Sequence, residues 1–172
     1  MATDAPAANA GLGKWILAGT VGAALMAALA WAGTRGVAQS TGQVQGVLAE
    51  NAKREGVRVT ESGLQFEEVR AGKGASPVAG DMVLLNYEGK LADGTVFDSS
   101  YASGQPAVFP VDGLIPGFSE ALKLMKPGGE YRIVIPPALG YGDKGAGGVI
   151  PPNAVLDFKV ELLAVAPGDA AQ

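Results

Sequence analysis

The chain has 172 residues, of which 48% are hydrophobic, with 26 glycines and 11 prolines. That length suits one domain with an appendage, and the many glycines and prolines favour short strands joined by turns over an all-helical chain. The formal net charge of −4 argues against a nucleic-acid partner. Cysteine and histidine are both absent, which excludes zinc fingers, thiol nucleophiles, Ser-His pairs and histidine acid–base chemistry.

An uncharged apolar run at residues 15–32 is the first element, with Lys14 before it, Arg35 after it and a tryptophan near each end. As a helix it would be about 27 Å long, just enough to span the hydrocarbon core of a bilayer, and aromatic residues at both ends are typical of membrane interfaces. Two interpretations stay open: a transmembrane signal anchor, and a signal peptide cleaved before Gln39. The length of the run favours the anchor.

The rest of the chain divides by composition. The segments are a polar N-terminus at 1–14, the apolar run at 15–32, a linker at 33–60, a folded domain at 61–165 and a tail at 166–172. The linker is rich in Gly, Ser, Thr and Gln. Within it, residues 47–55 predict a short helix that Gly56 ends.

Alternating apolar and polar residues predict the strands at the start of the folded domain. Residues 83–91 alternate in this way, as half-buried strands do, and Leu64, Phe66 and Val69 lie in a short strand-like segment before them. The Asp93-Gly94 pair that follows is a strong turn signal, and extended structure restarts at 96–97. These segments together predict a β meander.

One amphipathic helix follows the meander. Phe118, Ala121, Leu122 and Met125 recur at the spacing of one helix face, and Pro127 ends the pattern. Strand patterns return at 131–135 and at 156–162, where four apolar residues share one face. Four or five antiparallel strands and one helix are enough to curl a sheet across the helix and leave an apolar pocket between them. The predicted fold class is therefore α+β.

A glycine-rich loop, GYGDKGAGGVIPP at 140–152, contains the spacing G-x-G-x-x-G of dinucleotide-binding proteins. That fingerprint needs a helix leaving the loop, because the N–H groups of the helix bind the pyrophosphate. Here Pro151-Pro152 lead into a strand instead, and Ala146 stands where a P-loop requires lysine. No nucleotide is expected to bind.

Six blocks of the domain stand in a characteristic order: YEG at 87–89, GTVFDSS at 94–100, LIPGF at 114–118, EAL at 120–122, the glycine loop, and VLDFKVELL at 155–163. In this order they resemble the FKBP family of peptidyl-prolyl cis-trans isomerases, the macrolide-binding immunophilins. The resemblance runs from about residue 63 to residue 163. The lead-in AENAKREGVRVTESGLQF at 49–66 is similar to the bacterial Mip-type branch.

The resemblance implies a half-wrapped antiparallel sheet around one short helix, with a proline-binding pocket between them. Its implied walls are Tyr87, Phe97, Asp98, Phe109, Leu114, Ile115, Phe118, Tyr141, Ile150 and Phe158. The residues expected to carry the reaction are Tyr87, Asp98, Tyr141 and Phe158. The Tyr141 hydroxyl and the Ile115 backbone N–H are expected to hold peptide carbonyls, and Asp98 to accept a hydrogen bond from Tyr87.

Pattern alone favours a plainer interpretation of these residues, in which the phenylalanines are core packing and Asp98 caps a turn. The sequence also departs from the family pattern at three positions. Phe118 replaces the tryptophan common at the pocket floor, Ala107 replaces a second aromatic residue of many members, and Ala146 replaces a histidine of some. The smaller Phe118 ring is expected to leave a slightly deeper site, and the changes at Ala107 and Ala146 to alter partner and macrolide affinity more than the chemistry.

Prolyl isomerisation suits a chain without histidine or cysteine, because it breaks no covalent bond. Its barrier of about 18–20 kcal/mol is amide resonance, and a thousandfold acceleration needs only about 4 kcal/mol. The expected function is therefore that of a peptidyl-prolyl cis-trans isomerase. The alternative is a module that binds proline-containing segments, or a holdase, with little turnover.

The expected partners are proline-containing polypeptide clients, macrolide ligands, and a membrane reached through residues 15–32; no cofactor, metal or nucleic acid is expected. The isomerase domain at 61–165 is expected to be membrane-anchored on the periplasmic or extracytoplasmic side. The alternative is a soluble periplasmic or secreted protein after signal cleavage. The sequence leaves the oligomeric state open.

Overall fold

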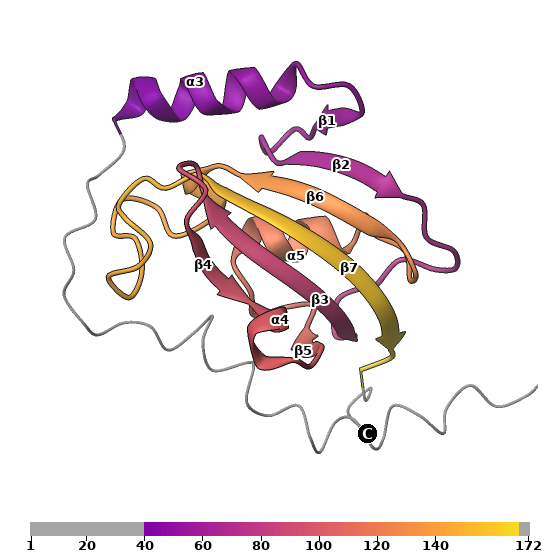
Figure 1. Ribbon diagram of the computed structural model, residues 1–172. Helices are drawn as coiled ribbons and strands as arrows, with labels where there is room; N and C mark the ends of the chain where they lie inside the picture. The colour runs from indigo at the N-terminus through magenta and orange to yellow at the C-terminus, as the bar shows by residue number, and fades with distance from the viewer. Residues whose placement is uncertain (1–39, 169–172) are drawn as a thin grey trace, which may run out of the picture.

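The computed structural model describes residues 40–168, which form an antiparallel sheet curved around a short helix (Figure 1). The helices are α3 (Thr41–Ala52), α4 (Ser100–Ser103), α5 (Pro116–Leu122) and the 3-10 helix η1 (Pro137–Leu139). The strands are β1 (Val57–Val59), β2 (Gln65–Arg70), β3 (Met82–Leu91), β4 (Val96–Ser99), β5 (Ala107–Pro110), β6 (Glu130–Ile135) and β7 (Leu156–Ala166). Neighbouring strands follow the order β1-β2-β6-β7-β3-β4, and β5 pairs with β3. The predicted α+β class is confirmed.

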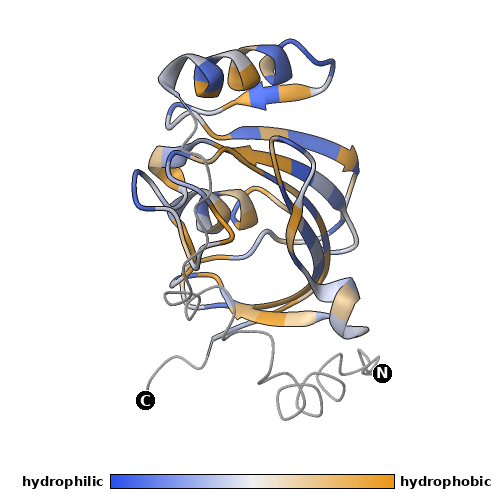
Figure 2. Cartoon of the chain, turned by 60° about the vertical axis from the view of Figure 1, so that its left-hand side comes forward, coloured by the Kyte–Doolittle hydropathy of each residue, from blue (hydrophilic) through white to orange (hydrophobic). Residues whose placement is uncertain are grey.

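The centre of the sheet is the pair β3 and β7, which is hydrogen-bonded over almost the whole of both strands. In this register Tyr87 lies opposite Val160, and Gly89 lies opposite Phe158. Hydrophobic and hydrophilic residues alternate along the long strands (Figure 2). The apolar residues on the inner face of β7 are fully buried, as the alternation predicted.

Helix α5 lies against the inner, concave face of this sheet (Figure 1). The predicted helix face is buried: Phe118, Ala121, Leu122 and Met125 have no exposed surface. The predicted helix, however, is too long. The observed helix α5 ends at Leu122. The residues after it form tight turns, in which the Met125 N–H donates to the Leu122 carbonyl at 3.1 Å. Met125 therefore keeps a helix-like spacing without being helical.

The strand predicted at 64–69 is confirmed as β2. Leu64 and Phe66 are buried, but Val69 is 56% exposed, because it stands three residues after Phe66 and therefore on the other face of an alternating strand. Two short strands, β1 and β5, were not predicted from the sequence. Strand β1 lies inside the segment predicted as a linker, so the sheet begins before residue 61.

Helix α3 also begins inside the predicted linker, at Thr41 and not at residue 47. Ser40 and Gln43 form a capping box there: the Ser40 Oγ accepts from the Gln43 N–H at 3.3 Å, and the Gln43 Oε1 accepts from the Ser40 N–H at 3.0 Å. This motif satisfies two amide groups that the first turn leaves without helical partners. The predicted end is three residues too late: α3 ends at Ala52 with Lys53 as its C-cap, and turns lead from there to Gly56, whose φ is 83°.

The glycine-rich loop enters through η1 and leaves into β7, so no helix begins at its end, in agreement with the sequence analysis. Ala146 and Ile150 form a small β-bridge that folds the loop back on itself. Two features of the backbone require glycine at position 145. Its φ is 65°, and a Cβ there would overlap the Ile150 carbonyl oxygen.

The predicted apolar helix at 15–32 lies outside the described residues, and so does most of the predicted tail. Between residues 40 and 168, no helix has the length and apolar character needed to cross a bilayer.

Candidate active site

A cluster of aromatic rings lies between the sheet and α5. We call it the aromatic cluster; its members are Tyr87, Phe97, Phe109, Phe118 and Phe158. They come from five elements, β3, β4, β5, α5 and β7, so the folded sheet is needed to bring them together. Phe158 is central. Its ring centroid is 5.1 Å from that of Phe118 and 5.4 Å from that of Phe97, and both pairs meet edge to face. Edge-to-face contact is the arrangement that aromatic quadrupoles favour.

Burial divides the predicted site into a floor and a rim. The buried residues form what we call the floor; they are Tyr87, Phe109, Phe118 and Phe158. Phe118 and Phe158 have no exposed surface, and Phe109 and Tyr87 are almost as deeply buried. The half-buried residues form what we call the rim; they are Phe97, Asp98, Leu114, Ile115 and Tyr141. Apart from Asp98, each of these packs against the buried core. Ile150 of the glycine loop is 6% exposed and belongs to the same core.

One hydrogen bond joins the floor to the rim. The Tyr87 hydroxyl donates to the Asp98 Oδ2 at 2.7 Å. The strand register explains the contact, because Asp98 lies opposite Gly89 in the pairing of β3 with β4, and Tyr87 shares a strand face with Gly89. The expected acceptance of a hydrogen bond by Asp98 is thus confirmed.

Both tyrosine hydroxyls of the site are held in the protonated form. Burial, and then the hydrogen bond and charge of Asp98, raise the pKa of Tyr87 far above its ordinary value of 10.0. Burial, and then the charge of Asp98, raise the pKa of Tyr141. At neutral pH both hydroxyls therefore remain neutral and can donate hydrogen bonds.

Ile115 stands at the N-cap of α5, where its backbone carbonyl accepts from the Phe118 N–H at 3.0 Å. Pro116 follows at the first helical position, where a missing N–H costs nothing. Ring contacts join Phe158 to Tyr87, Phe97 and Phe118, and Tyr87 in turn contacts Phe109 and Asp98. The other predicted site residues belong to the same hydrophobic core or pack against it; they are Leu114, Ile115, Tyr141 and Ile150. Sequence reasoning missed two residues of this region, Gly89 and Ser100. Gly89 lies in the block YEG and Ser100 in the block GTVFDSS, so the family blocks were the signal that could have pointed to them.

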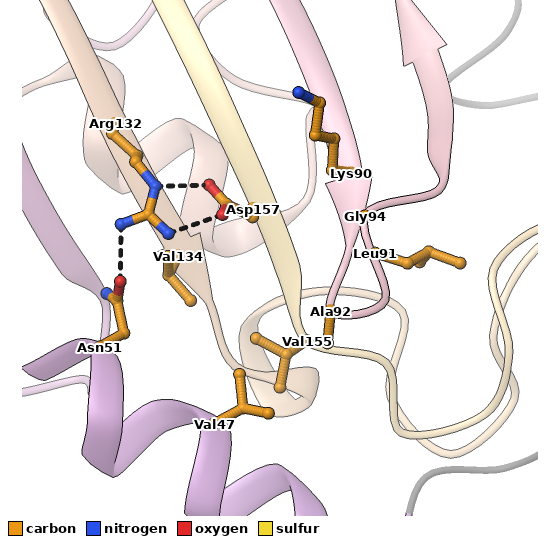
Figure 3. Close-up of a pocket in the computed structure, with 10 residues that line it drawn as sticks. All are labelled: Val47, Asn51, Lys90, Leu91, Ala92, Gly94, Arg132, Val134, Val155 and Asp157. Atoms are coloured by element: carbon orange, nitrogen blue, oxygen red, sulfur yellow. Dashed lines mark hydrogen bonds and ion pairs between the residues drawn. The ribbon is translucent and has the colours of Figure 1, made fainter.

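A cavity of about 210 Å³ lies away from the aromatic cluster, between α3, β6, β7 and the turn after β3 (Figure 3). Val47, Val134 and Val155 point toward it, beside an Arg132–Asp157 ion pair with a 2.6 Å contact. None of the predicted site residues lines this cavity. The Arg132 guanidinium is already bound to Asp157 and to the Asn51 side chain. No group of acidic side chains in residues 40–168 is arranged to hold a metal ion.

Comparison with known proteins identifies the domain. Residues 73–163 match the family described as FKBP-type peptidyl-prolyl cis-trans isomerase. The chain belongs to this family. It is 57% identical over 118 residues to the FKBP-type 22 kDa peptidyl-prolyl cis-trans isomerase of Escherichia coli K12, covering 69% of this chain and 57% of the relative. It is 52% identical over 118 residues to the peptidyl-prolyl cis-trans isomerase Mip of Coxiella burnetii, covering 69% of this chain and 51% of Mip.

Solved structures of this family confirm the FKBP fold. The crystal structure of FkpA from Escherichia coli matches with a TM-score of 0.71 and 47% identity, over 73% of this chain and 59% of FkpA. A peptidyl-prolyl cis-trans isomerase from Pseudomonas syringae matches with a TM-score of 0.70 and 35% identity, over 76% of this chain and 99% of that one. The FKBP resemblance and its bacterial, Mip-like branch are confirmed. The chain spans about half the length of the curated relatives it matches.

Proposed function

We propose that this FKBP domain is an active peptidyl-prolyl cis-trans isomerase that accelerates rotation of Xaa-Pro bonds in folding polypeptides. The observation that carries the proposal is the hydrogen-bonded pair Tyr87–Asp98 on the rim side of fully buried Phe158. The proline ring packs against the aromatic cluster, and the peptide on either side of it lies along the rim. Tyr87, Asp98, Tyr141 and Phe158 are the proposed catalytic residues.

Rotation of the Xaa-Pro bond removes the charge separation of the planar amide. Apolar surroundings around the proline therefore disfavour the planar ground state more than the twisted transition state. The ring surfaces of the aromatic cluster supply such surroundings. The uncatalysed rotation takes about 10 to 100 s, so even a thousandfold acceleration asks for only about 4 kcal/mol.

Fixed donors hold the peptide while the bond turns. We assign this role to the Tyr141 hydroxyl and the Ile115 backbone N–H, each of which would donate to a peptide carbonyl next to the proline. A tyrosine hydroxyl keeps its proton at neutral pH and can donate, and Tyr141 is half-buried at the rim. Asp98 fixes the Tyr87 hydroxyl and places a negative charge beside the rotating amide. The same rings are the proposed binding surface for macrolide ligands.

The test is a protease-coupled assay on a Xaa-Pro peptide, with the full chain purified in mild detergent. We expect the cis-to-trans rate to rise in proportion to protein concentration. A chain that binds the peptide without accelerating its isomerisation would be a binding module or holdase. A chain that neither binds nor accelerates would contradict both functions.

We further propose that residues 15–32 attach the protein to a membrane, with the isomerase domain on the periplasmic or extracytoplasmic side. The support is the uncharged apolar run and its flanking tryptophans. Cleavage before Gln39, giving a soluble periplasmic or secreted protein, is the alternative.

A further inference from the structure

Ser100 is a buried polar residue that the proposed mechanism does not use. It is 4% exposed and begins α4, directly after β4. Its Oγ accepts a hydrogen bond from the Tyr87 backbone N–H at 3.0 Å. The same hydroxyl lies 3.4 Å from the Asn86 Oδ1 and 3.4 Å from the Tyr87 carbonyl oxygen, to either of which it can donate.

The position of Ser100 in the sheet explains these contacts. The pairing of β3 with β4 joins Gly89 to Asp98 and Glu88 to Ser99. The next pair would be Tyr87 with Ser100, but there the chain turns into α4. The Ser100 hydroxyl therefore takes the place of a strand carbonyl as the acceptor for the Tyr87 N–H.

Tyr87 is consequently held by the β4–α4 segment at two points, its backbone N–H by Ser100 and its hydroxyl by Asp98. Tyr87 itself is fixed from the other side, because β3 pairs with β7 there. Strand β4 has only four residues and an irregular register beside Gly89, so few other bonds fix the direction of Asp98. The hydrogen bond of Ser100 ties the β4–α4 segment, which contains Asp98, to the central strand β3.

We propose that Ser100 is a positioning residue, which sets the Asp98 carboxylate against the Tyr87 hydroxyl at the rim. This inference rests on the proposed isomerase function. Its effect on catalysis passes through Asp98, and this distinguishes it from a role in stability alone.

Ser99 provides a matched control. It is the neighbouring serine, and its Oγ also accepts one backbone hydrogen bond, from the Tyr101 N–H at 3.2 Å. Loss of the Ser99 hydroxyl therefore removes a similar bond, but none that joins β4 to Tyr87.

The experiment compares kcat/KM on one Xaa-Pro peptide for the full chain and its variants Ser100→Ala, Ser99→Ala, Asp98→Leu and the double variant Asp98→Leu/Ser100→Ala. Thermal unfolding is recorded for each. We expect Ser100→Ala to lower kcat/KM about tenfold, because small misplacements of catalytic groups are costly. Ser99→Ala should stay within about twofold of the wild type. In the Asp98→Leu background, loss of the Ser100 hydroxyl should change the remaining rate by less than about twofold, while still lowering the unfolding midpoint.

If Ser100→Ala does not fold, Ser100→Cys replaces it in both backgrounds, because a thiol fills similar space with a weaker acceptor. Equal rates for the wild type and the Ser100 variant would overturn the inference, and so would the same loss with and without Asp98. Both results leave the isomerase function intact if the wild type is active. An inactive wild-type chain would overturn the isomerase function, and the inference with it.

Discussion

Asp98 and Phe158 are neighbours in the site but have different tasks in the proposed reaction. Asp98 is half-buried and accepts the Tyr87 hydroxyl, whereas Phe158 is fully buried beneath the proposed proline position. We expect Asp98→Leu and Phe158→Ala each to lower kcat/KM at least tenfold in the protease-coupled assay, which corresponds to about 1.4 kcal/mol. Unfolding curves must accompany the rates, since removing a buried phenylalanine costs about 3–5 kcal/mol. Wild-type rates in both folded variants would remove the site assignment.

Gly89 is the residue that makes room for the aromatic cluster. It is buried on β3, and a Cβ there would lie 2.6 Å from both the Phe97 and the Phe158 rings. One ring must therefore move in a Gly89→Ala variant. Phe158 is fully buried in the core, so the half-buried Phe97 is expected to move outward, toward solvent. We expect kcat/KM to fall about tenfold with the domain still folded.

Gly46→Ala is the control for that substitution. Gly46 is exposed on α3, and a Cβ there meets no atom within 4 Å. Alanine should stabilise the helix by about 1 kcal/mol and leave the rate unchanged. If Gly89→Ala and Gly46→Ala have the same rate, Gly89 has no part in shaping the site.

At the scale of elements, α3 is attached to the outer face of the sheet by buried amides. The Asn51 Oδ1 accepts from Arg132 at 2.6 Å, and the Asn51 Nδ2 donates to the Gln65 Oε1 at 2.6 Å. Gln65 in turn donates to the Leu48 carbonyl at 2.8 Å. The short helix predicted within the linker at 33–60 is thus docked on the sheet.

Asn51→Ala should release this helix without affecting catalysis. A buried donor and acceptor lose their partner, which costs about 1–3 kcal/mol. We expect faster amide exchange in α3 and an isomerase rate within twofold of the wild type. Gln65 and Arg132, which hold α3, alternate along their strands with the core residues Phe66 and Ile133 and so stand on the other face of the sheet from the core. Glu50→Ala is the control, since Glu50 is 75% exposed and, among residues 40–168, forms an ion pair only with nearby Lys53. Unchanged exchange in α3, or a collapse of the rate, would contradict this assignment.

Local patterns predicted the elements whose signals are local. The alternation along β3 and β7 and the apolar face of α5 were read correctly, because burial of one face imposes those periods. The three-residue strand β1 was missed, since it is too short to alternate. The start of α3 was missed because its capping box at Ser40 was not recognised. The end of α5 was misplaced because Met125 is buried by a turn that continues the helical spacing.

The site depended on a different kind of inference. Pattern alone favoured core packing for Phe118 and Phe158, and both are in fact fully buried. The pairing of Asp98 with Tyr87 arises from the register of β3 against β4, which residue spacing does not determine. Only the ordered family blocks pointed to these residues as a site. The roles proposed for Gly89 and Ser100 could not be predicted from the sequence, because they depend on contacts across the sheet. Gly89 lies against the Phe97 and Phe158 rings, and Ser100 accepts a hydrogen bond from the Tyr87 N–H.

At the scale of the whole molecule, the described domain is joined to an N-terminal segment that the proposal places in a membrane. We expect the native protein to sediment with membranes and to retain the residues before Gln39, because an uncharged run of this length favours an anchor. Fractionation followed by N-terminal sequencing checks this expectation. A mature protein that begins near Gln39 in a soluble extracytoplasmic fraction would show that the run is a cleaved signal.

The most direct test of the central claim is exchange NMR on a Xaa-Pro peptide mixed with the isotope-labelled full chain. It reads the cis–trans rate and the binding surface in one sample, without a protease. We predict that exchange becomes much faster than the uncatalysed time of about 10 to 100 s, and that peptide-induced shifts centre on Phe97, Asp98 and Tyr141. An uncatalysed rate, or shifts centred on the cavity beside Val47 and Val155, would contradict the account.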